Sequence, residues 1–483
     1  MLDNLSVKLW AVDPLVQMFQ DDLPPVKKAA SEVLAARNEL ETAQFGLRAD
    51  TQLTNISGHV IGMPSAKVEF VGHVPLTLNT HESPDSEYVR KAPDMFPDQR
   101  ISDPAATSME WTPVVAWNGT EYLVVWMDER NPPSRLRDIF GRRVSAAGSP
   151  IGEAFLISGS GATGNDVNPA VAWNGAEYLV VWEDYRNASN RGGDIYGRVV
   201  QADGSRPETD FRISGAEATD DDGSPDVVWN GTEYLVVWSD ERNSSRGADI
   251  YGRRVSAGGV PITGDFRISG PKATSSDWSA AAAWNEGDGR YLVVWSDNRD
   301  SSSRGADIYG RMVLADGARP ASDFRISGPK AVLSDQNPAV AWDGAGYLVV
   351  WQDNRNYLDR EQDIYGRVVL ADGSRPKADF RISGTKATHD DESPDVAWNG
   401  THYLVVWEDF RSSSSRGADI YGRMVLADGA RPAPDFRISS TAAISSDWDP
   451  AVAWNGVSHL VVWQDFRDSG SRGADIYGRR VGG

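Results

Sequence analysis

The sequence predicts an all-β protein built from seven copies of one unit of about 56 residues. Each copy contains four short segments with alternating apolar and polar residues, and the second segment ends in a recurring Trp. The last copy lacks its fourth segment, whereas the missing "RIS" stands before the first copy, at residues 100–102. We therefore expect a seven-bladed β-propeller that is closed by an N-terminal outer strand. The recurring tryptophans are Trp126, Trp182, Trp238, Trp295, Trp351, Trp407 and Trp463.

Four expected strands follow one another within each copy, and the second copy serves as the example. Its first strand is "PAVAWN", at residues 169–174, and an Asn-Gly pair then predicts a tight turn with positive φ. In the second strand, "YLVVW", the alternation places Tyr178, Val180 and Trp182 on one face. The third strand is "DIYGRVV" and the fourth is "DFRIS". Each copy also has an earlier Trp, here Trp173, which we expect to fill the wedge between neighbouring blades.

Residues 1–96 do not carry the repeat. We expect them to form a separate β-sandwich-like domain before a propeller at residues 97–483. The segments "VKLWAVDPLVQMF" and "AKVEFVGHVPLTLN" have the composition of strands. The segment "EVLAARNELETAQFGLRA" also has the composition of an amphipathic helix, so its pattern alone leaves helix and strand open.

The composition narrows the range of partners. The 483 residues carry a formal net charge of −21, which disfavours nucleic acid and anionic membrane surfaces. The absence of cysteine excludes thiol catalysis and cysteine-bound zinc. Membrane insertion is not expected, because no apolar run approaches the roughly 18 residues of a membrane span. The start, "MLDNLSVKLW", lacks a leader pattern, which leaves a cytoplasmic protein or a leader that is not present in this sequence.

An Asp-x-Arg follows each recurring Trp, and it has two interpretations. The pairs are candidate ligand-binding residues of the loop face, since each offers a carboxylate and a guanidinium to a sugar or to a carboxylate ligand. Alternatively, each pair is a hydrogen-bonded clip, which is the simpler explanation for a group that every copy contains. The pairs are Asp128 and Arg130, Asp184 and Arg186, Asp240 and Arg242, Asp297 and Arg299, Asp353 and Arg355, Asp409 and Arg411, and Asp465 and Arg467.

An acid also stands shortly before each first strand. Because the first strands of a propeller line its axis, these carboxylates would surround one mouth of the channel and attract a cation such as Ca2+ or a polyamine. Alternatively, each acid accepts backbone N–H groups of its own turn. No other cofactor is indicated. The candidate metal ligands are Glu110, Asp166, Asp222, Asp277, Asp335, Asp391 and Asp447.

Three tryptophans next to these acids, Trp111, Trp278 and Trp448, are candidate ligand-binding residues. The other four copies have different residues at this position, so folding does not require Trp there. A Trp beside a carboxylate is typical of sugar-binding surfaces, because the apolar face of a sugar stacks on an indole ring. The alternative is packing between loops.

Two resemblances extend these predictions. The pattern "VVWxDxR…DIYGRRV…ADG…FRIS" is similar to repeats in secreted proteins of myxobacteria and other bacteria, which implies a propeller. The segments "DDLPP", "AARNELETAQFGLRAD" and "VGHVPLTLNTHESPDSEYVRKAPDMFPD" resemble the β-sandwich module that precedes the catalytic barrel of bacterial glycoside-hydrolase-like proteins. This resemblance implies strand for the ambiguous segment. No barrel follows here, so it implies no catalytic residue.

We therefore expect a non-enzymatic protein, secreted or at the cell surface, whose propeller binds carbohydrate or another surface ligand through its loop face. Two alternatives stay open. One is a structural or assembly protein that self-associates through its N-terminal domain, and the other is a polysaccharide hydrolase. Enzymes are disfavoured here because an active site usually needs one or two specialised blades, and these blades are nearly identical. The sequence leaves the ligand and the oligomeric state open.

Overall fold

The chain divides into two compact units, Met1–Asp85 and Ser86–Gly483. In the first unit, β1 (Val7–Val12) pairs antiparallel with β2 (Gln44–Ala49), and β2 lies within the segment whose pattern left helix and strand open. The rest of the expected β-sandwich lies outside the described residues. The computed structural model describes residues 7–12, 44–49, 95–103, 108–130, 137–159, 164–243, 245, 247–331, 333–357, 361–387, 389–413, 417–440 and 445–482.

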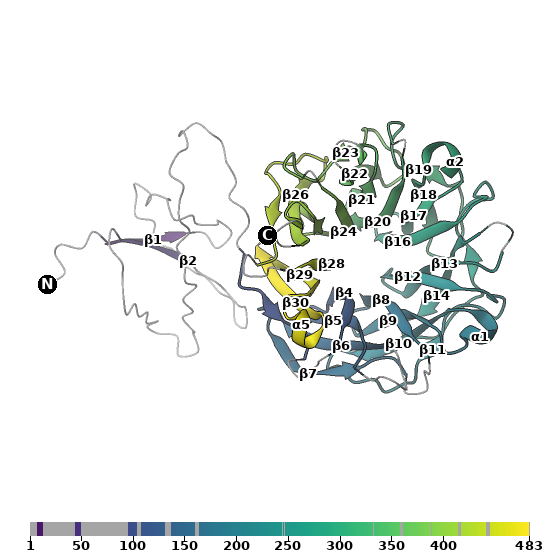
Figure 1. Ribbon diagram of the computed structural model, residues 1–483, viewed down its shortest axis with the longest axis horizontal. Coiled ribbons are helices and arrows are strands. Elements are labelled where there is room, and N and C mark those ends of the chain that lie inside the picture. The colour runs from purple at the N-terminus through teal and green to yellow at the C-terminus, as the bar shows by residue number, and fades with distance from the viewer. Residues whose placement is uncertain are drawn as a thin grey trace. The chain divides into compact units, whose positions relative to one another are not determined.

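The second unit is a ring of seven four-stranded antiparallel sheets, the blades (Figure 1). The strands of a blade follow one another from the axis to the rim, and we number the blades in chain order from the one that contains β4. The innermost strands are β4 (Glu110–Trp117), β8 (Asp166–Trp173), β12 (Asp222–Trp229), β16 (Asp277–Asn285), β20 (Asp335–Trp342), β24 (Asp391–Trp398) and β28 (Asp447–Trp454).

The next two strands of each blade form the body of the ring. The second strands are β5 (Glu121–Asp128), β9 (Glu177–Asp184), β13 (Glu233–Asp240), β17 (Arg290–Asp297), β21 (Gly346–Asp353), β25 (His402–Asp409) and β29 (Ser458–Asp465). The third strands are β6 (Asp138–Ser145), β10 (Asp194–Gln201), β14 (Asp249–Ser256), β18 (Asp307–Leu314), β22 (Asp363–Leu370), β26 (Asp419–Leu426) and β30 (Asp475–Gly482).

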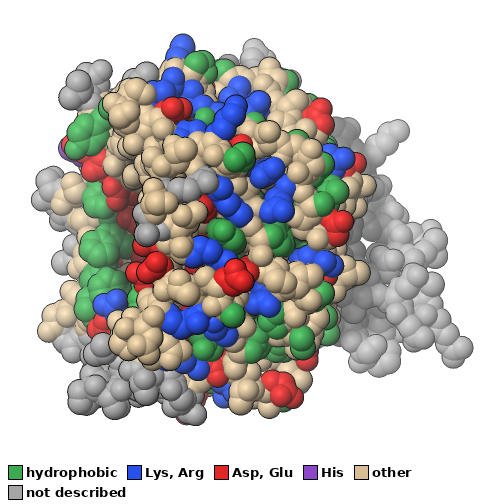
Figure 2. All heavy atoms as spheres, turned by 90° about the vertical axis from the view of Figure 1, so that its right-hand side faces the viewer, with side chains coloured by type: hydrophobic (Ala, Val, Ile, Leu, Met, Phe, Trp, Pro, Cys, Tyr) green, Lys and Arg blue, Asp and Glu red, His purple; other side chains and the backbone are tan. Residues whose placement is uncertain are grey.

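The outermost strands are short and form the rim, on which Lys and Arg side chains gather on the side that Figure 2 shows. Among the described residues, four-residue helices lie in three of the loops between second and third strands, namely α1 (Ala188–Arg191), α2 (Ser301–Arg304) and α5 (Ser469–Arg472). The outermost strands are β7 (Pro150–Leu156), β11 (Phe211–Arg212), β15 (Phe266–Arg267), β19 (Phe324–Arg325), β23 (Phe380–Arg381), β27 (Phe436–Arg437) and β3 (Gln99–Arg100).

Both faces of each second strand are buried between neighbouring blades, as the alternation predicts. On one face of β9, Trp182 packs with Leu123 and Val125 of blade 1. On the other face, Leu179 packs against β13 of blade 3. All seven recurring tryptophans are fully buried. The earlier Trp of blade 2, Trp173, is half-buried. It packs against the apolar cluster between blades 1 and 2, and its ring centroid lies 4.5 Å from that of Tyr178 in its own blade.

The outer strand of blade 7 comes from before blade 1. β3 pairs with β30, and the N–H of Ile101 donates to the carbonyl oxygen of Ile476 at 2.7 Å. The equivalent bond in blade 2 joins Ile213 to Ile195, also at 2.7 Å. Between blades 7 and 1, Arg142 donates from Nη1 to the carbonyl oxygen of Ile101 at 2.8 Å. That this pairing holds the ring shut stays a prediction, which is tested below.

Candidate functional site

The Asp-x-Arg pairs lie inside the blades. In blade 2, the Asp184 carboxylate accepts hydrogen bonds from the backbone N–H of Arg186 at 2.8 Å and from its Nη2 at 2.5 Å. The Arg186 guanidinium also contacts Asp210, which precedes the outer strand, and stacks on the Tyr196 ring at 4.0 Å from its centroid. The Asp184 side chain has no exposed surface. These contacts fasten the second, third and outer strands together.

The same arrangement recurs around the ring. The Asp of each pair is fully buried at its carboxylate, and each Arg is at most 21% exposed. These are the contacts of a clip, which was the alternative interpretation, and a ligand role for the pairs stays a prediction. The members are Asp128 and Arg130, Asp184 and Arg186, Asp240 and Arg242, Asp297 and Arg299, Asp353 and Arg355, Asp409 and Arg411, and Asp465 and Arg467.

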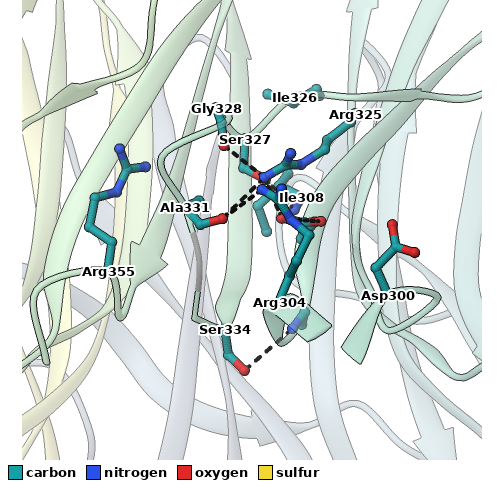
Figure 3. A network of polar contacts seen from close by, with 12 residues as sticks. Asp300, Arg304, Ile308, Arg325, Ile326, Ser327, Gly328, Ala331, Ser334 and Arg355 are labelled. Carbon is teal, nitrogen blue, oxygen red and sulfur yellow. Dashed lines mark hydrogen bonds and ion pairs between the residues drawn. The ribbon is translucent and has the colours of Figure 1, made fainter. Parts of the chain in front are cut away.

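A second set of polar contacts fixes the loops of one face, as Figure 3 shows for blade 4. Arg325 of β19 pairs with Asp307 at 2.6 Å and donates to the carbonyl oxygen of Gly328 at 2.7 Å. Arg304 of α2 donates to the carbonyl oxygen of Ala331 at 2.7 Å. The loop that leads to blade 5 is therefore tied to the loop that carries α2, and both lie at the same end of the blade.

The seven acids that were expected before the first strands are fully buried and do not face solvent at the mouth of the channel. The reason is that the first strand begins at the acid itself, so Asp166 lies in the ladder directly opposite Asp184. Burial and the neighbouring Asp184 carboxylate raise the pKa of Asp166 to about 9. The acid is therefore neutral at pH 7 and lies beside the clip. The set is Glu110, Asp166, Asp222, Asp277, Asp335, Asp391 and Asp447.

Ca2+ binding by these seven acids stays a prediction. The described part of the chain contains no group of three or more His, Asp or Glu side chains with the arrangement of a metal site.

The mouth of the channel is built instead by a bulge in each first strand. In β8 the pairing shifts between Val167 and Ala170, and Asn168 adopts a left-handed backbone with φ of 52°. Such a conformation is costly for a residue other than glycine and is often found at functional sites. We call the seven residues in this position the mouth ring. They are Thr112, Asn168, Ser224, Ser279, Asn337, Ser393 and Asp449.

Each mouth-ring residue lies near the penultimate residue of a second strand. Asn168 donates from Nδ2 to Glu183 Oε2 at 3.0 Å in its own blade, and the Ser224 N–H donates to the same oxygen from the next blade at 3.3 Å. These penultimate residues differ from blade to blade, and they are acids only in blades 2 and 6. They are Met127, Glu183, Ser239, Ser296, Gln352, Glu408 and Gln464.

Two acids meet where blades 6 and 7 adjoin. The N–H of Asp449, in β28, donates to Oε1 of Glu408, in β25, at 2.8 Å. Burial, the nearby Asp449 carboxylate and Glu392 raise the pKa of Glu408 to about 8, although hydrogen bonds from the Asp449 N–H and the Ser393 hydroxyl oppose this. Burial also raises the pKa of Asp449, whereas a hydrogen bond from the Thr112 hydroxyl of blade 1 lowers it.

Two of the three predicted tryptophans lie beside these acids. Trp448 is adjacent to Asp449 in β28, and its ring centroid lies 4.6 Å from that of Phe466. Trp111 of blade 1 meets the same Phe466 at 6.3 Å. The third, Trp278, is 38% exposed in β16 of blade 4, on the other side of the ring (Figure 1). The structure therefore brings Trp111 and Trp448 together, and Trp278 lies apart from them.

A buried amide completes this part of the mouth. Gln464 of β29 pairs in register with Trp448 and has no exposed surface. Neither its oxygen nor its nitrogen has a hydrogen-bond partner among the described residues. Buried polar groups without partners are rare and often mark the place of a water or a ligand. We define the junction site as Thr112, Glu408, Asp449, Gln464, Trp111 and Trp448.

Sequence reasoning missed Glu408, Asp449 and Gln464. It compared positions that every copy shares, whereas these three are departures from the repeat. Met127, Ser239 and Ser296 stand at the positions equivalent to Glu408. Aligning the copies and asking which of them place an acid at a position that is otherwise uncharged would have found Glu183, Glu408 and Asp449.

Neither a protein-family model nor a curated protein sequence matches this chain. Several solved structures have a similar fold. A polysaccharide lyase gives a TM-score of 0.50 at 10% identity, over 77% of this chain and 90% of the lyase. An α-L-arabinofuranosidase from Fusarium graminearum gives 0.45 at 13% identity, over 66% of this chain and 93% of that enzyme. An α-L-arabinanase from Penicillium chrysogenum gives 0.43 at 14% identity, over 65% and 92%.

These comparisons correct the expectation of a non-enzymatic binding protein. The similar structures are those of enzymes named for their action on glycans. The blades are also less alike than expected at the mouth, because blades 6 and 7 carry acids at positions where most blades have uncharged residues. At these identities the likeness shows the fold alone. Among the described residues, no helix is long and apolar enough to cross a membrane.

Proposed function

We propose that this protein hydrolyses a polysaccharide at the junction site. The observation that carries the proposal is the hydrogen bond from the Asp449 N–H to the Glu408 carboxyl group, which brings two acidic residues of adjacent blades together. The raised pKa of Glu408, about 8, keeps its carboxyl group protonated at neutral pH. Glycoside hydrolysis uses such a pair, with one protonated and one ionised member. The glycan-degrading enzymes that share the fold support the proposal.

In this proposal, Glu408 is the general acid. Its pKa of about 8 keeps it protonated at pH 7, so it can donate its proton to the oxygen that leaves as the glycosidic C–O bond breaks. Asp449 is half-buried and accepts a hydrogen bond from Thr112, so it is the more accessible carboxylate. It takes a proton from the water whose oxygen bonds to the anomeric carbon, or it attacks that carbon first and is released by water.

The aromatic side chains supply the binding surface. Trp448 and Trp111 are both half-buried around Phe466, so each keeps part of an indole ring exposed next to the acids. Sugar rings have apolar C–H faces that stack on such rings. The unpartnered amide of Gln464 gives a donor and an acceptor for a sugar hydroxyl or for a water that binds one.

The test is hydrolysis of a panel of polysaccharides by the full chain, with reducing ends as the readout. Glu408→Gln keeps the shape of the side chain and removes the acid, so we expect a loss of roughly 100-fold or more in kcat. Glu183→Gln makes the same change at the equivalent position of blade 2 and is the matched control, for which we expect a change below about threefold.

Three results would contradict the proposal. These are a wild-type protein that is inactive on every glycan, equal losses in the two variants, and products that carry a new ultraviolet-absorbing double bond. The last result identifies a lyase, which breaks the chain by elimination without adding water.

We also keep several broader expectations as proposals. They are secretion or a cell-surface location, a β-sandwich-like domain at residues 1–96 before a propeller at residues 97–483, and self-association through the N-terminal domain. The separation of Met1–Asp85 from Ser86–Gly483 supports two independent units. Expression of residues 86–483 alone, with measurement of folding, mass in solution and activity, tests the independence of the units and the role of the N-terminal one in self-association.

A further inference from the structure

The formal charge of −21 overstates how negative the surface of this protein is. Among the described residues, 25 Asp and Glu residues are buried, whereas no Lys or Arg is. The seven acids of the first strands, such as Asp166 and Asp222, have pKa values raised far above the ordinary range by burial and by a neighbouring Asp. With pKa values of about 9, Asp166 and Asp222 carry no charge at pH 7. The buried acids of the clips are paired with Arg, so the surface charge must be considered region by region.

Pairs of arginines lie on the outer rim where blades 3, 4, 5 and 6 adjoin. Figure 2 shows Lys and Arg gathered on the side of the ring that contains blades 3 and 4. At each of these three boundaries, one Arg comes from a third strand and another from the turn that follows it. We call the six residues the rim arginines. They are Arg311 and Arg319, Arg367 and Arg375, and Arg423 and Arg431.

The two arginines of a boundary are held in place by the preceding blade. Arg311 donates from Nη1 to the carbonyl oxygen of Ile268 at 2.8 Å, and from Nε to that of Ala321 at 2.8 Å. Arg319 donates to the carbonyl oxygen of Arg267, and its guanidinium lies 5.2 Å from the centroid of the Phe266 ring. The other two boundaries repeat this arrangement, with Arg375 over Phe324 at 4.6 Å and Arg431 over Phe380 at 5.2 Å.

These positions leave positive charge without a partner. None of the rim arginines lies within 4.0 Å of a carboxylate oxygen among the described residues. Arg311 has no hydrogen bond from Nη2, and Arg319 has none from Nε or Nη2, within the described part of the chain. Burial and then repulsion from Arg431 lower the pKa of Arg423. Asp323 belongs to the same blade as Arg311, but its carboxylate already pairs with Arg299.

We propose that the rim arginines bind a carboxylated polysaccharide, and this inference rests on the proposed action on glycans. A guanidinium with two free donors on one side matches a carboxylate. The phenylalanine rings pack against the guanidinium groups of Arg319, Arg375 and Arg431 and help to hold them in place. Because the arrangement repeats at consecutive blade boundaries, one polymer can contact several of them at once. The rim is separate from the junction site, so it would hold the chain while the mouth cleaves it.

The test measures binding of the full chain to polygalacturonate, with dextran as the uncharged comparison and single-stranded DNA as the phosphate polyanion. In the triple variant Arg319→Gln, Arg375→Gln, Arg431→Gln, we expect binding to weaken by about tenfold, because three charge-assisted contacts are lost. The matched control removes three positive charges from exposed loop positions, as Lys272→Gln, Lys330→Gln, Lys386→Gln. We expect it to change the affinity by less than about twofold.

The outcomes separate this inference from the proposed function. Binding that is lost in the Arg variant alone, and kept in Glu408→Gln, supports the rim as a site distinct from the junction site. The inference is overturned if the wild type does not bind polygalacturonate, if both triple variants weaken binding equally, or if DNA binds more tightly. In each of these cases, the hydrolysis assay on neutral glycans still decides the proposed function independently. The melting temperature of each variant shows that binding losses do not come from unfolding.

Discussion

Residues inside the blades are nearly the same in every copy, whereas residues at the mouth of the channel differ from blade to blade. Inside, the pairing of Asp353 with Arg355 of blade 5 recurs in every blade, and the bond from Trp351 Nε1 to Asp353 recurs in every blade except blade 6. At the mouth, the position of Glu408 is occupied by three other residue types around the ring, and Asp449 is the only acid of the mouth ring. The repeated contacts explain how the ring folds, and the unrepeated ones show where chemistry can be localised.

This difference also separates two kinds of unusual acid. The pKa of Asp166 and that of Glu408 are both raised by burial and a nearby carboxylate. Asp166 is fully buried and has six equivalents, whereas the partner of Glu408, Asp449, is partly exposed and belongs to the mouth ring. A raised pKa alone therefore does not mark a site in this protein. The position within the repeat decides which raised pKa matters.

The largest expected effect comes from replacing a tryptophan by alanine inside a blade, and the same replacement at the mouth serves as the comparison. Trp351→Ala empties a fully buried position between blades, so we expect it to lower the free energy of unfolding by about 3–5 kcal/mol. Trp278→Ala at the mouth removes a side chain that is 38% exposed, and we expect a change within about 0.5 kcal/mol. Denaturant unfolding of both variants measures the difference. Similar losses would mean that the mouth tryptophans are also part of the core.

A smaller effect is expected in blade 7, whose outer strand comes from before blade 1 and not from its own copy of the repeat. Ile101 packs on Gly478 as Ile213 packs on Gly197, and both isoleucines are fully buried. If β3 holds the ring shut, Ile101→Ala and Ile213→Ala should each lower the free energy of unfolding by about 2–5 kcal/mol. The same denaturant measurement decides this. A neutral Ile101→Ala beside a costly Ile213→Ala would show that residues 99–102 are not bound in solution.

The smallest effect concerns a departure from the repeat inside blade 7. Six blades have a Tyr at the second position of the second strand, and Tyr234 donates from its hydroxyl to the carbonyl oxygen of Glu177 in the preceding blade at 3.1 Å. Blade 7 has His459 there, fully buried and without a hydrogen-bond partner among the described residues. Burial lowers the pKa of His459 to about 3 from its ordinary 6.5.

The unfolded chain therefore binds a proton at His459 that the folded chain excludes, and stability falls as the pH drops from 6.5 towards 3. His459→Tyr removes this dependence, so at pH 5 we expect the variant to gain roughly 2 kcal/mol relative to its gain at pH 8. Unfolding measured at the two pH values tests the sign. A gain that does not depend on pH would show that His459 already carries its charge in the folded protein.

The features that all copies of the repeat share could be predicted from the sequence. The Trp period predicted seven blades, and the alternation around Trp182 predicted which side chains are buried. The position of Asp166 was misjudged because the bulge at Asn168 extends the first strand by three residues, and no turn signal marks a bulge. The junction site was missed because Glu408 and Asp449 lie in adjacent blades, so only the ring brings them together. The stacking of Trp173 on Tyr178 of its own blade was not predicted.

The contacts of β3 have a consequence for how the gene could be rearranged. Arg142 holds Ile101 of blade 7 with the same kind of bond with which Arg198 holds Ile157 of blade 1, at 2.8 and 2.9 Å. The same bond recurs at all seven boundaries between blades, so this contact gives the break in the chain no privileged place among them. A circular permutant that links Gly483 to Met95 and opens at another boundary would keep these contacts, and its termini would lie at a different place relative to the junction site and the rim arginines.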